Sequence, residues 1–477
     1  MLDNLQKAVQ IGESEGADYV EARYDDLTLR TLEKVTDNWK DILIKKRTGV
    51  GITCYYKGVA GFSFTAGTKD SEVESAVRRA VKLAKAVQPA AKLPLEFDKR
   101  PPIKTNGSSL NSQLVKRHPS SESIDYKIDL VDRAVASAQE HGKNISNIIG
   151  LYGELYGQKL LTNSDSSVLD WEFEIIDLRC LVTSKTESGD LVIGAKGFGG
   201  TRGLEIFGEK ENTPERMGKI AGLNAKEQIE AKACPAGIYK SLVENRLVGI
   251  LAHESFGHLS EGDFVVTGGS PLSKKIGEHI GSEHATIIDS GVPDIMKYGG
   301  LYVPYDDQGI QGNETIILEN GILKHYLHNR GTAKNQNQEP TGNCRAVHFA
   351  FMPIPRMTNT YFASGDLSGE EEALELLDTG IYAIQSSGGQ VEGDGNFLFK
   401  AIRGYWVEKG EIKYPIREVS LSGNILDLLK NVEGGTKDLG LYSGYFGGCG
   451  KWDQFPLPVG FGGPKLVISG VRFGGKA

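Results

Sequence analysis

The sequence predicts an α+β protein in which an N-terminal α+β domain is followed by a mainly β C-terminal domain. A chain of 477 residues is long enough to form two separate cores. Helical periodicity is largely confined to the first half. The 60 glycines are concentrated after position 190, which is typical of the tight turns of a β-rich region. We therefore place the boundary near Pro235 and predict domains 1–234 and 235–477.

The first domain is expected to begin with an amphipathic helix and a group of strands. Leu5, Ala8 and Val9 form the apolar side of that helix. A second helix follows the strands, and Ser71 with Glu74 is a possible capping box at its start. Its apolar residues recur at helical spacing and are Val73, Ala76, Val77, Ala80, Val81, Ala84 and Val87. Period-two alternation predicts strands near 19–30, 42–46, 51–56 and 59–65.

Residues 88–122 predict an exposed excursion, because they hold five prolines, many polar residues and a local excess of Lys and Arg. Two further helices are expected, from Asp125 to His141 and from about Thr213 to Ala233. Strand-like runs between these two helices occupy 144–151, 157–162 and 169–182. Past residue 258 only Gly369 to Asp378 has a helical pattern.

Composition argues against several functional classes. The formal net charge is −8 at pH 7, so the surface is a poor partner for nucleic acid or anionic lipid. The first residues have neither a basic region nor an apolar core, and no 18-residue apolar window occurs. We expect a cytoplasmic protein that binds no membrane. The five cysteines show no paired framework and are Cys54, Cys180, Cys234, Cys344 and Cys449.

The segment from His253 to His258 has the composition of a zinc hydrolase site. It reads His-Glu-Ser-Phe-Gly-His and follows the apolar run 247–252. Zinc takes neutral imidazole ligands, and hydrolysis needs a carboxylate near the activated water. His253 and His258 are therefore candidate ligands, and Glu254 is the candidate general base. The alternative to a zinc site is that the motif occurs by chance, or that the two residues are ordinary histidines near a helix end.

The two histidines are one residue farther apart than in the familiar His-Glu-x-x-His motif. In a regular α-helix a five-residue step turns roughly 500°, so the rings would point about 140° apart. The segment must therefore be overwound or bulged. Gly257 is a plausible place for a π-type bulge, a feature that is often found at functional sites.

A third ligand is needed, and spacing alone does not select it. Cys449 has one advantage, because Gly447, Gly448 and Gly450 surround it and let the backbone approach a metal closely. It is also a possible nucleophile paired with a histidine, although that scheme leaves Glu254 without a role. The other candidates are Glu261, Asp263, Cys344, His279, His284, His325, His328 and His348.

Three blocks of the sequence resemble the signature blocks of the TldD/PmbA family of metalloproteases. They are HESFGHLSEGD at 253–263, PRMTNT at 355–360 and GCGKWDQFPLPVG at 448–460, in the order of the family. The resemblance covers essentially the whole chain. Further segments that fit the pattern are 235–237, 305–307, 341–343 and 474–475.

The resemblance implies a zinc-dependent cytoplasmic peptidase that acts on unstructured peptides or unfolded protein. His253, His258 and Cys449 would be the zinc ligands and Glu254 the general base. Because the metal motif is present, the chain resembles the catalytic TldD type rather than the TldE type that lacks the motif. A dimer is implied, either a homodimer or a heterodimer with a motif-lacking paralogue.

Other residues of these blocks carry weaker predictions. Arg356 and Asn359 are candidates for holding a peptide backbone or carboxylate, and Lys451 for stabilising an oxyanion; a structural turn and a surface lysine are the respective alternatives. The sequence departs from the family pattern at Gln308, at Trp452 with Asp453, and at Cys344. These departures bear on substrate preference rather than on the reaction class.

Two other functions remain open at this level. The first is a non-catalytic peptide-binding or regulatory protein with a structural zinc, which would normally show four protein ligands instead of three. The second is a cysteine hydrolase that uses Cys449, whose activity would resist chelators and be abolished by alkylation.

Overall fold

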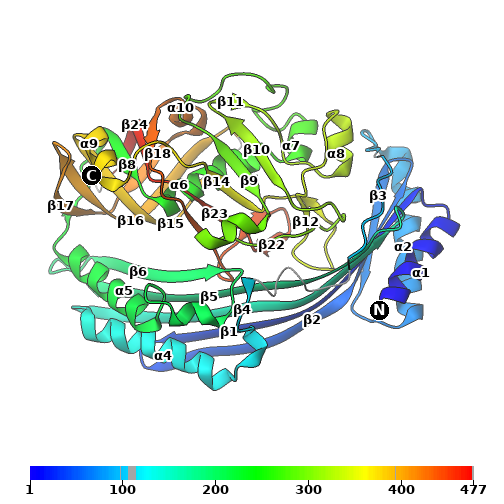
Figure 1. Cartoon of the computed structure of the whole chain (residues 1–477), viewed down its shortest axis with the longest axis horizontal. Coiled ribbons are helices and arrows are strands. Elements are labelled where there is room, and N and C mark those ends of the chain that lie inside the picture. Colours follow the sequence, from blue (N-terminus) through cyan, green and yellow to red (C-terminus); the bar gives the residue numbers. More distant parts are fainter. Residues whose placement is uncertain (97, 106–113, 393, 475–477) are drawn as a thin grey trace.

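The computed structural model has the predicted α+β class, and it describes residues 1–96, 98–105, 114–392 and 394–474. A long, curved sheet from the first half of the chain runs along the molecule (Figure 1). Helices cover one face of this sheet, and the C-terminal half lies on the other face. The described residues contain no helix that is long and apolar enough to cross a membrane.

The N-terminal sheet is antiparallel throughout, with strand order β3-β2-β1-β4-β5-β6. Alternation along β1 explains its two faces. Val20, Ala22 and Leu32 are buried under the helices, whereas Glu21 and Leu27 face the C-terminal half. The strands are β1 (Tyr19–Val35), β2 (Asn38–Tyr56), β3 (Val59–Thr65), β4 (Ile145–Asn163), β5 (Val168–Lys185) and β6 (Leu191–Gly200).

The strands are longer than predicted. The expected separate strands at 42–46 and 51–56 are one strand, β2, and those at 144–151 and 157–162 are one strand, β4. Alternation marked only parts of these strands. Ladder hydrogen bonds to β1 keep 47–50 extended, and those to β1 and β5 keep 152–156 extended. β6 was not predicted, because its alternation is diluted by glycine.

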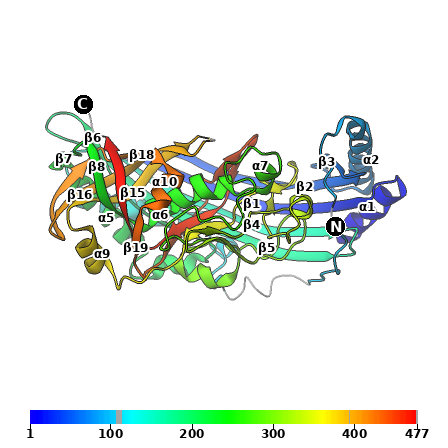
Figure 2. The same ribbon diagram turned by 90° about the horizontal axis from the view of Figure 1, so that it is seen from above.

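Among the described residues, four helices pack on this sheet. α1 (Leu2–Ser14) and α2 (Asp70–Val87) cover one end, and α4 (Ile124–His141) and α5 (Pro214–Ile229) cover the other (Figures 1 and 2). The predicted capping box at Ser71 was wrong. α2 begins two residues earlier, where the Glu72 carboxylate accepts a hydrogen bond from the Lys69 backbone N–H at 3.1 Å.

The C-terminal half contains two larger sheets. One has the order β15-β8-β24-β18-β16-β17-β7, and β15 also pairs with β16, so part of it closes on itself. The other has the order β11-β10-β9-β14-β23-β20. The first comprises β7 (Lys232–Ala233), β8 (Gly237–Val243), β15 (Gly380–Val391), β16 (Asn396–Glu408), β17 (Glu411–Arg417), β18 (Ser420–Asn424) and β24 (Leu466–Gly474), with β19 (Val432–Gly435) paired to β24. The second comprises β9 (Ile287–Ser290), β10 (Glu314–Glu319), β11 (Ile322–Leu323), β14 (Asn359–Phe362), β20 (Gly440–Ser443) and β23 (Gly460–Gly463).

Short pairs and helices complete this half. Two small hairpins carry signature residues: β12 (Cys344–Arg345) with β13 (Ile354–Pro355), and β21 (Cys449–Lys451) with β22 (Gln454–Leu457). The predicted helix at 369–378 is confirmed as α9 (Glu370–Leu377). The expectation of no other helix there was wrong, because helices of five or six residues are too short to show a period. These are α7 (Gly262–Val266), α8 (Arg330–Asn335) and α10 (Ile425–Lys430).

The predicted excursion at 88–122 falls partly on 97 and 106–113, which lie outside the described residues. Most of the described residues in 88–96 and 98–105 are exposed, but Val115 is buried. β7, which ends just before Pro235, pairs with β17 of the C-terminal sheet. The domain division at 234 and 235 stays a prediction.

The contact between the two halves contains a buried acidic residue on β1. Glu21 is 1% exposed, and one of its carboxylate oxygens accepts a hydrogen bond from Gln308 Nε2 at 2.9 Å. The other oxygen is buried without a partner among the described residues. Burial raises the pKa of Glu21 to about 8, although nearby arginines oppose the shift. The unusual Gln308 thus supplies a neutral donor beside a carboxyl group that is largely protonated at pH 7.

The raised pKa of Glu21 predicts a pH dependence of stability. Its ordinary value is 4.5, so between pH 4.5 and about 8 the folded chain holds a proton that the unfolded chain releases. The free energy of unfolding therefore falls as pH rises through this window. We expect the Glu21→Gln variant to lose less thermal stability than the wild type between about pH 5 and about pH 8. Glu283→Gln, which changes an exposed carboxylate, is the control, and an unchanged pH profile in Glu21→Gln would contradict the assignment.

Candidate metal centre

The His-Glu motif lies on a segment that changes from an α-helix to a π-helix. α6 (Asn245–Ile250) continues directly into a π-helical run, Leu251–Gly257. A π-helix bonds residue i to residue i+5, which brings two side chains five residues apart to the same face. The rings of His253 and His258 accordingly lie 5.3 Å apart between centroids. The expected π-type distortion is confirmed.

Glycines allow this helix to pack closely against the block at 355–360 and against β23. A Cβ atom at Gly257 would collide with Sδ of Met357, and one at Gly249 would collide with the backbone of Gly462. Only residues without a side chain allow such close approaches. Gly257 therefore matters for packing as well as for helix geometry.

Cys449, at the start of β21, reaches the two histidines from the far end of the chain. Its Sγ lies 3.2 Å from His258 Nε2. One candidate ligand atom from each of His253, His258 and Cys449 lies within 4.8 Å of the other two. His253 Nδ1 is buried and has no hydrogen-bond partner among the described residues. Two imidazoles and a thiol form a donor set that suits zinc, so the residues present fit this ion.

The charges of the three groups depend on one another. Burial opposes ionisation of the Cys449 thiol, but the two imidazoles outweigh it and lower its pKa to about 5. Burial also lowers the pKa of His258, but Glu261 and the Cys449 sulfur outweigh it and raise that pKa well above its usual value. The thiol is therefore a thiolate at neutral pH, which is the form that binds metal.

A buried carboxylate orients His258. Glu261 Oε2 lies 3.1 Å from His258 Nδ1, on the opposite side of the ring from Cys449. The same carboxylate lies 3.0 Å from Lys451 Nζ. The sequence offered Glu261 as a direct ligand, but it contacts the ring nitrogen that points away from the site. Such outer carboxylates fix the tautomer and orientation of a metal-binding histidine.

This contact predicts a metal-binding defect in Glu261→Gln. The amide is nearly isosteric but does not supply the negative charge that holds the ring, so we expect zinc affinity to fall by about 10- to 100-fold. Competition between the protein and a chromogenic zinc chelator measures the affinity. Asp263→Asn is the matched control, because Asp263 contacts Lys451 at 2.7 Å but not His258. An equal loss in both variants would show that the effect arises from Lys451 instead.

A cavity of about 560 Å³ opens beside the histidines, between β5–β6 and the C-terminal half. Glu254 lines it with a side chain that is 36% exposed, and its Oε2 lies 4.0 Å from His258 Nε2. The carboxylate is thus next to the group of candidate ligands and open to the cavity. Apolar wall residues include Leu181, Phe198, Ile250, Val459 and Phe461.

Comparison with known proteins identifies the chain. Three family models match it in order, each described as part of the PmbA/TldA metallopeptidase: domain 1 at residues 44–84, the central domain at 117–229 and the C-terminal domain at 236–475. The C-terminal model alone spans half of the sequence. The chain belongs to the PmbA/TldD metallopeptidase family.

Relatives of this PmbA/TldD chain extend along its full length. It is 33% identical over 468 residues to Metalloprotease MJ0996 of Methanocaldococcus jannaschii, covering 97% of each chain. It is 28% identical to the Zinc metalloprotease TldD homolog of Saccharolobus solfataricus, covering 98% of this chain and 99% of the relative. The fold matches the crystal structure of TM0727 from Thermotoga maritima, with a TM-score of 0.78, 22% identity and 99% coverage of both chains. The chain is a metalloprotease.

The remaining predicted residues of this PmbA/TldD chain form contacts within the chain. Arg356 is fully buried and donates to the Cys449 carbonyl oxygen at 2.7 Å. Asn359 is fully buried and donates from Nδ2 to Ser290 and Leu301 carbonyl oxygens. Lys451 is 5% exposed and contacts Glu261 and Asp263. Their roles with substrate stay predictions, and these contacts favour structural roles.

The other candidate ligands lie outside the described His-His-Cys group. Asp263 pairs with Lys451, and Cys344 is buried in the β12–β13 hairpin beside Asp306. The histidines that do not join the group are His279, His284, His325, His328 and His348.

Proposed function

We propose that this metalloprotease is a zinc-dependent peptidase for unstructured peptides, of the catalytic TldD type, in which His253, His258 and Cys449 hold zinc and Glu254 is the general base. This proposal rests on one observation: three candidate ligand atoms lie within 4.8 Å of one another, beside the cavity that Glu254 lines. The name of the Saccharolobus relative, a zinc metalloprotease, supports the choice of metal.

The ligand number favours a catalytic site over a structural one. Within the described residues the group has three members, and catalytic zinc sites typically combine three protein ligands with an open position. When bound, zinc supplies Lewis acidity that activates water and polarises a carbonyl group. Glu254 accepts the proton of the attacking water and passes it to the leaving amine. Its partial exposure to the cavity lets the same carboxylate reach both.

The wall of the cavity suits an extended peptide. β6 is at the end of the described sheet order, so one side of its backbone has no neighbouring strand there. An unfolded peptide can satisfy its backbone groups by adding to such an edge. Gly197 and Gly199 of β6 line the cavity. Gly199 packs against the Ser443 carbonyl oxygen, so an added peptide strand would pair with the part of β6 that precedes it. This mode predicts little side-chain specificity and poor cleavage of folded proteins.

The decisive experiment combines metal analysis with peptide cleavage. We expect about one zinc per chain, cleavage of an unstructured peptide that stops with a chelator, and recovery on adding zinc. Circular dichroism of the chelated protein should still show a folded chain, because the cores form without the ion. Unfolding on chelation with Glu254 dispensable would favour the structural-zinc alternative. Cleavage that resists the chelator but not alkylation would favour the cysteine hydrolase.

The assembly and location implied by the family also remain proposals. We propose a dimer, formed with a second copy or with a motif-lacking paralogue, and a cytoplasmic location. The five cysteines are all free thiols and all buried, which suits a reducing compartment. Light scattering of the purified chain, alone and with a motif-lacking paralogue, tests the assembly.

A further inference from the structure

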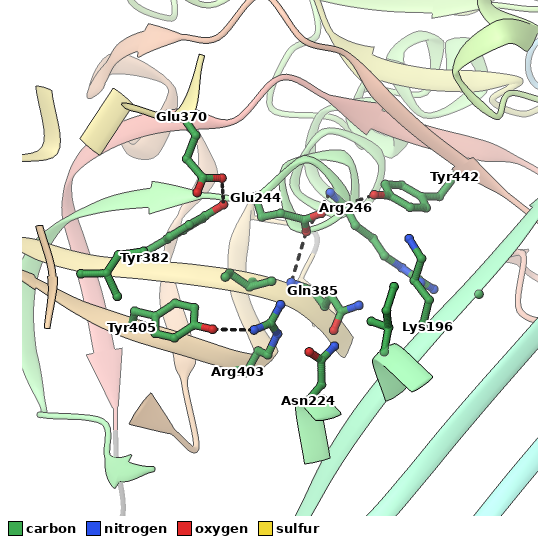
Figure 3. Close-up of a pocket in the computed structure, with 14 residues that line it drawn as sticks. Lys196, Asn224, Glu244, Arg246, Glu370, Tyr382, Gln385, Arg403, Tyr405 and Tyr442 are labelled. Carbon is green, nitrogen blue, oxygen red and sulfur yellow. Dashed lines mark hydrogen bonds between the residues drawn. The ribbon is translucent and has the colours of Figure 1, made fainter. Parts of the chain in front are cut away.

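A second chamber adjoins the cavity of about 560 Å³ beside the histidines, which we call the metal cavity. It has a volume of about 490 Å³, and four of its lining residues also line the metal cavity: Lys196, Gly197, Arg246 and Tyr442. Figure 3 shows that charged and polar side chains from β6, α5, α6, β15 and β16 surround it. The chamber is therefore polar, whereas the metal cavity has largely apolar walls.

Two cations in this chamber lack a counter-ion. Within the described residues no carboxylate oxygen lies within 4.0 Å of a side-chain nitrogen of Lys196 or Arg246. Arg246 Nε is buried without a hydrogen-bond partner there, and its guanidinium lies over the Tyr442 ring at 5.4 Å. Burial lowers the pKa of Lys196 and of Arg246, and the carboxylates that act on them, Glu244 with Glu211 or Asp177, only partly oppose the shift.

The acids of the chamber are already engaged. Glu244 Oε2 accepts hydrogen bonds from the backbone N–H groups of Arg246 and Gln385, each at 3.2 Å. Its Oε1 lies 3.4 Å from the Tyr442 hydroxyl. The remaining charged lining residues have partners of opposite charge: Glu370, which also accepts a hydrogen bond from Tyr382, lies 3.8 Å from Lys465, and Arg403 pairs with Glu227.

The charge balance near Lys196 and Arg246 is therefore one anion short. Arg179, another cation close to Arg246, is already neutralised by Asp177 at 2.6 Å. Glu244 is the one carboxylate that acts on both Lys196 and Arg246 at longer range. A bound carboxylate would restore neutrality, and the guanidinium fork matches its two oxygens.

We infer that Arg246 and Lys196 form a subsite for a carboxylate of the peptide substrate, placed beside the metal cavity. This inference rests on the proposed peptidase function. The carboxylate is either the C-terminus of the peptide or an Asp or Glu side chain, since both present the same group.

The position of Arg246 determines how far along the peptide the recognised carboxylate lies from the cleaved bond. It precedes His253 by seven residues on one helical segment, which is α-helical to Ile250 and π-helical from Leu251, so the two residues lie roughly two turns apart along the axis. An extended peptide advances about 3.3 Å per residue. The recognised carboxylate therefore lies a few residues from the cleaved bond, and the two cations select where the chain is cut.

The test uses three unstructured peptides that differ only in their anion: one with a free C-terminus, one amidated, and one amidated with a Glu added near its end. Binding to the zinc-loaded Glu254→Gln protein is measured by calorimetry, and cleavage by the wild type is mapped by mass spectrometry. We expect both acidic peptides to bind about tenfold tighter than the neutral one. If only the free C-terminus is favoured, the ligand is the terminal carboxylate, and if the Glu peptide is also favoured, side chains are accepted.

Variants of the two cations show whether they are responsible for the preference for acidic peptides. Adding Arg246→Gln or Lys196→Gln to the same background should remove most of the preference for acidic peptides while zinc content stays at the parent value. Lys226→Gln is the matched control, because Lys226 is an exposed cation on α5 that does not line the chamber. Lys196→Gln also tests the subsite if Arg246→Gln fails to fold.

The outcomes separate the two proposals. Equal binding of acidic and neutral peptides, or a preference that survives both variants, overturns the subsite even when cleavage is normal. A preference that depends on Arg246 and Lys196 supports the subsite even if the wild type cleaves none of the peptides, and that absence of cleavage would instead contradict the peptidase assignment.

Discussion

Replacing Glu254 with Gln is expected to lower kcat by about 10²- to 10⁴-fold, the usual contribution of a general base, while the chain keeps its zinc. The amide does not accept a proton from water, but it has nearly the same size as the carboxylate. Glu254 is outside the His-His-Cys group and borders the cavity at 36% side-chain exposure. The change therefore removes the proposed base without altering the three candidate ligands.

The measurement is single-turnover cleavage of an unstructured peptide, with zinc determined on the same samples. Glu254→Asp keeps a carboxylate on a shorter arm and should recover part of the lost rate, which a purely structural role would not produce. Glu283→Gln, at an exposed carboxylate, controls for the loss of one charge. Full turnover in Glu254→Gln would rule out this residue as the base.

Local features of the sequence predicted the first half of the site. His253 and His258 were recognisable as a pair because their residue types match zinc chemistry, and their five-residue spacing required the π-helical turn that the structure contains. Cys449 was suggested by its glycine-rich surroundings and selected by the family resemblance. The spacing of the two histidines is a signal within a few neighbouring residues, where helix geometry is nearly independent of the rest of the fold.

The second half of the site depends on long-range packing that the sequence does not encode locally. Glu261 was considered as a ligand, but only the three-dimensional position of Cys449 shows which nitrogen of His258 remains for the carboxylate. Arg246 and Lys196 come from α6 and β6, and β6 itself was not predicted. Their shared chamber exists only because the C-terminal half lies on the N-terminal sheet.

The same limit applies to the signature block at 355–360. Its Arg and Asn suggested contacts with substrate, yet Arg356 holds the backbone of Cys449, and Asn359 fastens β14 to the segments of Ser290 and Leu301. Sequence shows that these residues are polar. It does not show that their partners are carbonyl groups of the same chain.

Replacing Cys449 with Ala is expected to remove zinc and cleavage together. The thiolate is one of three converging donors, and its loss should weaken zinc binding by more than the roughly 10- to 100-fold that an outer-shell change costs. Zinc content by elemental analysis and chelator-sensitive cleavage are measured on the same preparations. Cys234→Ala is the matched control, since Cys234 is also a buried thiol of the C-terminal core but does not belong to the group.

Zinc content is the measurement that distinguishes the two possible roles of Cys449. A nucleophilic cysteine and a zinc ligand would both lose activity on replacement by Ala, so cleavage alone decides nothing. The low pKa of the thiol suits either role, because a thiolate between two imidazoles attacks a carbonyl as well as it binds a cation. Replacement of a ligand, however, should remove the zinc, whereas replacement of a nucleophile should leave the zinc content unchanged. Loss of zinc in Cys449→Ala, with cleavage that resists alkylation in the zinc-loaded wild type, would exclude the nucleophile and give Glu254 the proton-transfer role that the cysteine scheme does not need.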